Sequence, residues 1–374
     1  MIYFDNSATT YPKPKEVYDA LDYANRNLSF NAGRGLYKES NQVANMIEET
    51  RKIIGSFVSV RYENVVFTSS ATESLNIIIN GIDFEDGDNV YITPFEHNAI
   101  VRPLYNIKKS INLNIILLPF DRNTWKPDTN KIEEMFSIRK PKAVFVSQVS
   151  NVVGLEVDYL SIFKISKSFG SINVLDSAQV FGIKNPNLVD CDYCVFAGHK
   201  SLYASFGIAG FVIAGNDNLK VTKAGGNGSD SLNHDMPQKG YSKYESGSLN
   251  SVAIYGLKTS CEWLAKNNIL KHEIELTEYL IDSISKINKI KLYLPCDNKV
   301  LGILSFSVEG YSSDEVASIL SDEFDIKVRS GYHCSPFVHD FIESHETKGT
   351  VRVSIGAFNN RYQIDELIKA LETL

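Results

Sequence analysis

Short apolar runs alternate with longer stretches of helical spacing through the first two thirds of this chain. Seven runs have the length and the β-branched character of buried strands: residues 65–68, 90–93, 115–118, 143–147, 172–175, 193–197 and 210–214. Most of them are separated by a segment with helical spacing. This alternation predicts an α/β fold with a mainly parallel seven-stranded sheet, covered by helices on both faces.

The pattern changes beyond residue 250. A helical stretch over 251–267 leads to a second unit, which reads as helices at 273–286, at 313–324 and at the C-terminus, with strands at 291–294, 301–308, 326–329 and 351–355. We expect this α+β unit to have its own core. The prediction is a large domain over 15–255 and a smaller one formed by 1–14 and 256–374. A flexible loop is expected over the glycine-rich residues 225–231.

Composition narrows the class of protein. The 374 residues carry a net charge of −7 without a Lys/Arg-rich run, which argues against a nucleic-acid surface. No basic leader and no uncharged run long enough to cross a membrane is apparent, so we expect a cytoplasmic protein without membrane contact. Five cysteines are an odd number and form no disulfide framework, so at least one is a free thiol.

The segment from Asp192 to Lys200 is central to the chemistry. An apolar strand ends at Ala197, and Gly198 and His199 lead to Lys200. Desolvation at the end of a buried strand lowers the pKa of a lysine and makes its amine a usable nucleophile. The alternative is a lysine that extends from a strand end into solvent.

Asp176 ends the run before this segment, 24 residues ahead of Lys200. A buried lysine paired with a carboxylate that faces a protonated ring nitrogen is the combination that pyridoxal phosphate (PLP) requires. Gln179 could then donate to the ring hydroxyl. The alternative for Asp176 is a helix N-cap at a strand–helix junction.

Two further segments follow strands. Residues 69–76 open a helix with small and hydroxylated side chains, which suits a phosphate at the helix N-terminus or an ordinary capping box. His97 follows the strand 90–93, where it could stack on a planar ring and move protons, or simply be solvated.

The C-terminal unit adds a thiol and a guanidinium. Cys334 lies in the loop Arg329-Ser-Gly-Tyr-His-Cys334 rather than in an apolar run, which suits a reactive cysteine. Arg352, in a strand, could grip a carboxylate with two hydrogen bonds or face solvent. Cys191 and Cys194 have the spacing of metal ligands but lack companions, so we interpret them as packing residues and expect no metal.

Together these residues resemble the class V, aspartate-aminotransferase-like PLP enzymes, specifically the cysteine desulfurase and selenocysteine lyase branch. The likeness covers the whole chain and rests on the order and spacing of nine motifs: Asp5-Asn-Ser-Ala-Thr-Thr10, Ser70-Ala-Thr-Glu-Ser74, Glu96-His97-Asn-Ala99, Ser150-Asn151-Val-Val-Gly154, Asp176-Ser-Ala-Gln179, Gly198-His199-Lys200, Glu245-Ser-Gly-Ser248, Arg329-Ser-Gly-Tyr-His-Cys334 and Arg352-Val-Ser354. The context of Cys334 is similar to that of the short-loop, second group of desulfurases.

The resemblance implies a role for each site residue. Lys200 would bind PLP covalently, Asp176 would face the pyridine nitrogen, Gln179 would meet the ring hydroxyl and His97 would stack on the ring and take part in catalysis. The phosphate would be held by Ala71, Thr72 and His199, with Ser248 contributed by the other subunit of a homodimer. Asn151 and Arg352 would bind the substrate carboxylate. Where the family usually has Ser or Thr near the phosphate, this chain has Ala197.

The implied activity is conversion of L-cysteine to L-alanine, with the sulfur captured as a persulfide on Cys334 and passed to an acceptor protein or thiol. Selenocysteine lyase is an alternative that would use the same pocket. A class V aminotransferase would not use Cys334. A non-enzymatic sulfur-relay scaffold is a further alternative, against which the lysine and aspartate argue.

Overall fold

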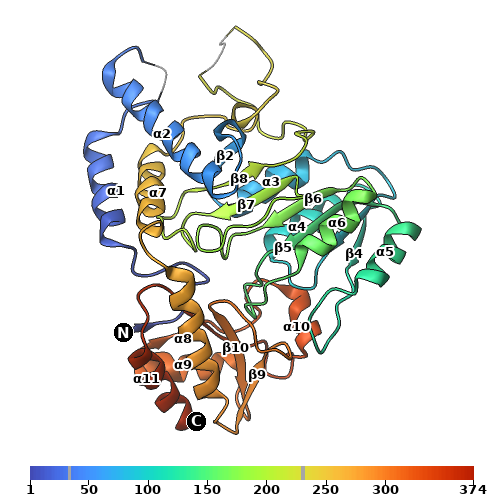
Figure 1. The fold of residues 1–374 in the computed structure, drawn as a ribbon, viewed down its shortest axis with the longest axis vertical. Coiled ribbons are helices and arrows are strands. Elements are labelled where there is room, and N and C mark those ends of the chain that lie inside the picture. Colours follow the sequence, from blue (N-terminus) through green and yellow to red (C-terminus); the bar gives the residue numbers. More distant parts are fainter. Residues whose placement is uncertain (33–34, 229–231) are drawn as a thin grey trace.

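A computed structural model describes residues 1–32, 35–228 and 232–374 of the chain. Figure 1 shows a sheet flanked by helices, with a C-terminal unit, orange to red, packed below it. The N-terminus lies on this C-terminal unit, far in sequence from the segment it contacts. The positions Gly33, Arg34 and 229–231, the last of them in the expected flexible loop, fall outside the described residues.

The seven expected strands all form, and they lie in one sheet. Its order is β2-β8-β7-β6-β5-β3-β4. The strands are β2 (Val65–Thr68), β3 (Asn89–Ile92), β4 (Asn114–Leu117), β5 (Pro141–Ser147), β6 (Ile172–Asp176), β7 (Tyr193–Ala197) and β8 (Ala209–Ile213). The sheet is mainly parallel, as expected; β8 runs antiparallel to both of its neighbours, β2 and β7. The predicted α/β fold is confirmed.

Alternating side chains of these strands belong to two separate cores. Val65 and Phe67 pack into one apolar cluster with Val144 and Val146, whereas Val66 packs into the other. Because successive side chains of a strand point to opposite faces, this division shows that both faces of the sheet are buried. Burial on both faces explains why these strands appear in the sequence as continuous apolar runs.

Helices cover the two faces. One face packs against α3 (Ala71–Gly81) and α4 (Asn98–Ile107). The other packs against α2 (Lys38–Phe57), α5 (Thr129–Ile138), α6 (Tyr159–Ser168) and α7 (Ser251–Leu264), with α1 (Lys15–Asn27) lying along α7. The predicted domain boundary at residue 255 falls inside α7, and the division into domains stays a prediction.

The C-terminal unit has the expected elements in the expected order, with one additional helix, and it has its own apolar cluster. Strands β9 (Ile290–Tyr293), β10 (Ile303–Val308) and β12 (Val351–Ser354) form an antiparallel sheet, accompanied by α8 (Ile269–Ile284), α9 (Ser313–Phe324) and α11 (Arg361–Glu372). A second small sheet joins β1 (Ile2–Tyr3) to β11 (Ile326–Lys327) in parallel. The N-terminal segment is thereby fixed to this unit.

One helix was not expected. The sequence predicts a loop between residues 329 and 351, but α10 (Pro336–Ile342) forms there, two residues after Cys334. Pro336 stands at the first helical position, where a missing N–H is tolerated, and Val338 and Ile342 are buried one turn apart. Within the described part of the chain, no helix is long and apolar enough to span a membrane.

Candidate active site

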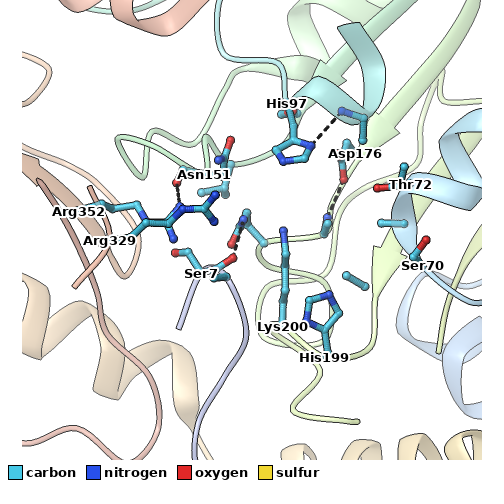
Figure 2. A pocket seen from close by; sticks show the side chains of 18 residues that line it. Ser7, Ser70, Thr72, His97, Asn151, Asp176, His199, Lys200, Arg329 and Arg352 are labelled. Atoms are coloured by element: carbon cyan, nitrogen blue, oxygen red, sulfur yellow. Dashed lines mark hydrogen bonds between the residues drawn. The ribbon is translucent and has the colours of Figure 1, made fainter. Parts of the chain in front are cut away.

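One cavity of about 220 Å³ collects most of the predicted site residues at the carboxyl ends of the parallel strands. Figure 2 shows Lys200 and His97 between Arg329 and Arg352 on one side and Ser70 and Thr72 on the other. The lining includes the predicted residues Ala71, Thr72, His97, Asn151, Asp176, Gln179, His199, Lys200 and Arg352. The residues of the large sheet come together because their strands end at the same edge, and Arg352 reaches the cavity from β12 of the C-terminal unit.

Lys200 projects from a tight turn after β7. Gly198 opens this turn and cannot be replaced without movement, since a Cβ there would lie 2.5 Å from the carbonyl oxygen of Ile208. The turn therefore brings β7 and the start of β8 into close contact. Desolvation lowers the pKa of Lys200 to about 8, against the opposing attraction of the Asp176 carboxylate. The uncharged, reactive amine is therefore reached at a pH only slightly above neutral, far below the pKa of an exposed lysine.

Asp176 is the last residue of β6 and is buried. Burial raises the pKa of its carboxyl group, while the backbone N–H of Ala178 and the charge of Lys200 lower it. The Ala178 N–H donates to its Oδ1 at 3.0 Å. A turn rather than an α-helix follows Asp176, so the alternative role as a helix N-cap does not apply. Gln179, in the same turn, donates from Nε2 to the Ser7 carbonyl at 3.3 Å.

His97 is the N-cap residue of α4, and its ring is oriented by the first turn of that helix. Its Nδ1 accepts a hydrogen bond from the Ala99 N–H at 3.0 Å, drawn in Figure 2. Burial, with smaller effects of Lys200 and neighbouring arginines, lowers the pKa of His97 to about 3. The ring is therefore neutral, and its proton sits on Nε2. His97 can donate from Nε2 to a group in the cavity.

The opposite end of the cavity suits an anion. Ser70 caps α3, accepting from the Glu73 N–H at 3.1 Å, and Ala71 and Thr72 of the first turn line the cavity. Residues 69–76 therefore combine the capping role with a helix N-terminus that faces the cavity. His199 contributes a buried Nδ1 without a hydrogen-bond partner among the described residues. Burial, then the charges of Lys200 and Lys13, lower the pKa of His199 to about 4.

Two arginines line the other side. The guanidinium of Arg352 is 1% exposed; it donates from Nη1 to the Asn151 carbonyl at 2.8 Å and from Nη2 to Asp5 Oδ1 at 2.6 Å. Its Nε is buried without a partner among the described residues. Arg329 is paired with Arg352 through backbone hydrogen bonds in both directions. Two guanidinium groups at one end of the cavity suit a carboxylate there.

Cys334 lies in a loop held in an unusual conformation. Gly331, His333 and Cys334 all have positive φ angles, of 88°, 47° and 59°. The loop is anchored on both sides: Cys334 O accepts from the Asn98 N–H at 2.7 Å, and the His333 ring contacts Thr350 at 2.9 Å. The Sγ is exposed and accepts a hydrogen bond from Arg329 Nη2 at 3.4 Å. That interaction is stronger for a thiolate than for a thiol.

Two predicted residues lie outside the cavity. Cys334 does not line it, although Arg329 lines the cavity and donates a hydrogen bond to the Cys334 sulfur. Ser248 is exposed and lines a different cavity, beside Arg51 and Tyr241, so its assignment to the phosphate of the other subunit stays a prediction. Cys191 and Cys194 are buried, as the interpretation as packing residues requires.

Sequence reasoning assigned no role to Asp5, Arg329 or Ser7. All three belong to motifs on which the resemblance rests. Asp5 pairs with a residue 347 positions away, so no local pattern could indicate its partner. Arg329 ends the expected strand 326–329, five residues before Cys334. This position at a strand end is the feature of the sequence that could have indicated a place in the site.

The residues present fit PLP. Lys200 can offer its amine to an aldehyde, and Asp176 can offer a buried carboxylate to a ring nitrogen. The N-terminus of α3 and the unpartnered His199 Nδ1 can supply hydrogen-bond donors to a phosphate. Ala197, where the family usually has a hydroxyl, lines the same cavity without adding a donor. The described residues contain no group of three or more metal-ligating side chains.

Comparison with known proteins extends over the full chain. The family model for aminotransferase class-V matches residues 2–367. A probable cysteine desulfurase of Methanothermobacter thermautotrophicus is 29% identical, over 100% of this chain and 94% of that protein. One from Borreliella burgdorferi is 30% identical, over 100% of this chain and 91% of its own length.

A solved structure has the same fold. The apo structure of a cysteine desulfurase from Thermococcus onnurineus NA1 superposes with a TM-score of 0.91 at 28% sequence identity. The match covers 100% of this chain and 94% of that one. Similarity in sequence and in structure therefore includes both the sheet that carries Lys200 and the C-terminal unit that carries Cys334.

Proposed function

The chain belongs to the aminotransferase class-V family, and we propose that it is a PLP-dependent cysteine desulfurase that converts L-cysteine to L-alanine and captures the sulfur on Cys334. The observation that carries the proposal is the position of Cys334 beside the lysine site. Arg329 lines the cavity that contains Lys200 and Asp176, and the same guanidinium contacts the exposed Cys334 sulfur. An aminotransferase has no use for a thiol at this position.

PLP would be held by Lys200, Asp176 and the phosphate-binding residues of α3, with His97 against the ring. When bound, PLP supplies an electron sink that stabilises negative charge at the substrate α-carbon. The chain's own contribution is to keep the Lys200 amine available near neutral pH and the Asp176 carboxylate close to it. Lys200 Nζ is then placed to accept the α-proton of the amino acid.

The substrate carboxylate would be bound at the arginine end. Arg352 is fixed by Asp5 and by the Asn151 carbonyl, so its guanidinium does not need to reorganise when substrate enters. Arg329 supplies a second positive charge on the side that faces Cys334. This arrangement orients the amino acid with its carboxylate at the arginines and its amino group toward Lys200.

The sulfur transfer requires no external oxidant. The Cys334 thiolate attacks the sulfur of bound L-cysteine; the substrate C–S bond breaks and an S–S bond forms. The carbon that loses sulfur gains a proton, so that cysteine and a protein thiol become alanine and a protein persulfide. His97, neutral with its proton on Nε2, is a donor available in the cavity. The persulfide sulfur then passes to an acceptor protein or a thiol.

We also propose that the enzyme is a homodimer. Ser248 is exposed and does not line the cavity of its own chain, which supports a role for Ser248 of the partner subunit at the phosphate end. A donor from the partner would offset the missing hydroxyl at Ala197.

The test is anaerobic incubation of the holoenzyme with L-cysteine and a reductant, with alanine and sulfide measured together. We expect equal amounts from the wild type and neither from Cys334→Ser. Cys296→Ser, which removes the other exposed thiol, is the matched control and should retain activity. Activity that survives in Cys334→Ser would exclude the persulfide route, and a wild type that forms neither product would overturn the proposal.

A further inference from the structure

The N-terminal segment from Asp5 to Lys13 crosses from the C-terminal unit to the turn that carries Lys200. At one end, Asp5 pairs with Arg352, and the Ser7 N–H donates to Ser354 Oγ at 2.9 Å. At the other end, the segment reaches the peptide between His199 and Lys200. It therefore touches both the carboxylate-binding arginine and the backbone of the reactive lysine.

Three residues of this segment donate to a single carbonyl, that of His199. The Thr10 N–H lies at 3.1 Å, the Thr9 hydroxyl at 3.0 Å and the Lys13 ammonium at 2.8 Å from the carbonyl oxygen. This carbonyl belongs to the peptide bond that precedes Lys200. Its position fixes the direction in which the Lys200 side chain leaves the backbone.

Lys13 differs from the other donors because it is a titratable amine, which carries a charge at a pH below its pKa. Its ammonium is partly buried and contacts only neutral oxygens: the His199 carbonyl, Thr10 Oγ1 at 2.6 Å and Thr9 Oγ1 at 3.4 Å. No carboxylate of the described residues forms an ion pair with it. Burial without a carboxylate lowers the pKa of Lys13 to about 7. Burying an ammonium without a carboxylate partner costs desolvation free energy. The position of Lys13 therefore has a reason other than adding charge to the surface.

We propose that Lys13 is a positioning residue for Lys200: its charged hydrogen bond to the His199 carbonyl holds the peptide from which the Lys200 amine reaches the cofactor. The inference rests on the proposed function, since it assigns Lys13 a role in the covalent capture of PLP. Lys13 does not line the cavity, so it acts through the backbone and not by touching the cofactor. Hydrogen bonds to charged groups are stronger than those between neutral groups, which is why an ammonium suits this role.

The test follows the covalent capture of PLP without any L-cysteine at pH 6.5, below the pKa of Lys13, so that the ammonium form is present. Full-length protein is stripped of PLP and mixed with it again, the mixture is quenched with borohydride at intervals, and the mass of the Lys200 peptide gives the trapped fraction. We expect Lys13→Met to trap PLP at least about tenfold more slowly than wild type, the size of effect that follows from losing one charged hydrogen bond. Lys13→Arg, which keeps the charge, should return to within about threefold.

Lys15→Met is the matched control, because Lys15 lies two residues further on, is exposed and pairs only with Asp19. It should trap PLP at the wild-type rate. Capture at the wild-type rate by Lys13→Met, or equally slow capture by Lys13→Met and Lys13→Arg, would overturn the inference. If Lys13→Met does not fold, Lys13→Gln decides in its place. A wild type that traps no PLP on Lys200 would instead contradict the proposed function itself.

Discussion

Asn151 holds the loop of Cys334 by donating from Nδ2 to the His333 carbonyl at 2.8 Å. Its Oδ1 in turn accepts from the Ser335 hydroxyl at 2.7 Å, so the two side-chain atoms of Asn151 bracket Cys334 on both sides in sequence. Asn151 was expected to bind the substrate carboxylate, and that role stays a prediction. The geometry adds a second role, in which Asn151 positions the sulfur acceptor relative to the cavity.

The two roles of Asn151 predict different kinetics. If Asn151 mainly positions the loop, Asn151→Ala should lower kcat for alanine formation by about tenfold or more and change KM by less than about threefold. Ser335→Ala should have a similar effect, since Ser335 contacts Asn151 but does not line the cavity. A rise in KM for L-cysteine with an unchanged kcat in Asn151→Ala alone would favour carboxylate binding instead.

Substitutions of Arg352 and Arg329 should affect different kinetic parameters. Arg352→Lys removes the planar guanidinium that spans Asp5 and the Asn151 carbonyl, so KM for L-cysteine should rise by about tenfold or more. Arg329→Lys disturbs the contact with the Cys334 sulfur and should mainly lower kcat. Steady-state assays of both variants give the comparison. An effect of Arg352→Lys on kcat alone would contradict the assignment.

The pH dependence of PLP capture follows from Lys200 and Asp176. The reactive form of Lys200 is the free amine, so in wild-type protein stripped of PLP the capture rate should rise with pH through about 8. The Asp176 carboxylate favours the ammonium form, so its removal in Asp176→Asn lowers the pKa of Lys200 further. The rise should therefore occur at lower pH in the variant. Borohydride trapping between pH 5.5 and 9 measures both profiles, and a shift to higher pH would contradict the pairing.

The fold was predictable because its signal is local. Most strands of the large sheet are buried on both faces, so they appear in the sequence as short apolar runs, and the alternation with helices implies parallel strands. The carboxyl-edge positions of Asp176, His97 and Lys200 follow from that topology. Helix α10 was missed because its seven residues are too few to establish helical spacing after the loop of Cys334.

Pairings between distant segments were not predictable. Asp5 and Arg352 are 347 residues apart, and Lys13 contacts a carbonyl 186 residues away. Composition and periodicity carry no information about such contacts, since each residue alone is consistent with a surface position. The sequence could therefore indicate most of the residues that line the cavity, but not the distant residues that contact them.

Glu96, directly before His97, predicts a pH dependence of stability. It is fully buried and accepts hydrogen bonds from the Thr93 hydroxyl and from the Ser147 N–H and hydroxyl. Burial raises the pKa of Glu96 from 4.5 to about 7. Between these values the folded state keeps a proton that the unfolded state releases, so the stability from this group is complete below pH 4.5 and is lost as the pH rises to about 7.

The isosteric Glu96→Gln variant removes this titration. Its amide oxygen can accept the two hydrogen bonds made to Oε1, and its NH2 group can donate to the Ser147 hydroxyl in place of the third. The free energy of unfolding of the PLP-free wild type should therefore fall, relative to that of Glu96→Gln, by about 3 kcal/mol between pH 4.5 and 8. Denaturant unfolding at several pH values measures the difference, and Glu133→Gln, on the exposed side of α5, serves as the control with no such trend. A difference that stays constant with pH would show that Glu96 is ionised in the folded protein. Its carboxylate would then add a second negative charge near Asp176, and negative charge favours the ammonium form of Lys200. Another positive charge nearby would be needed to keep the pKa of Lys200 at about 8.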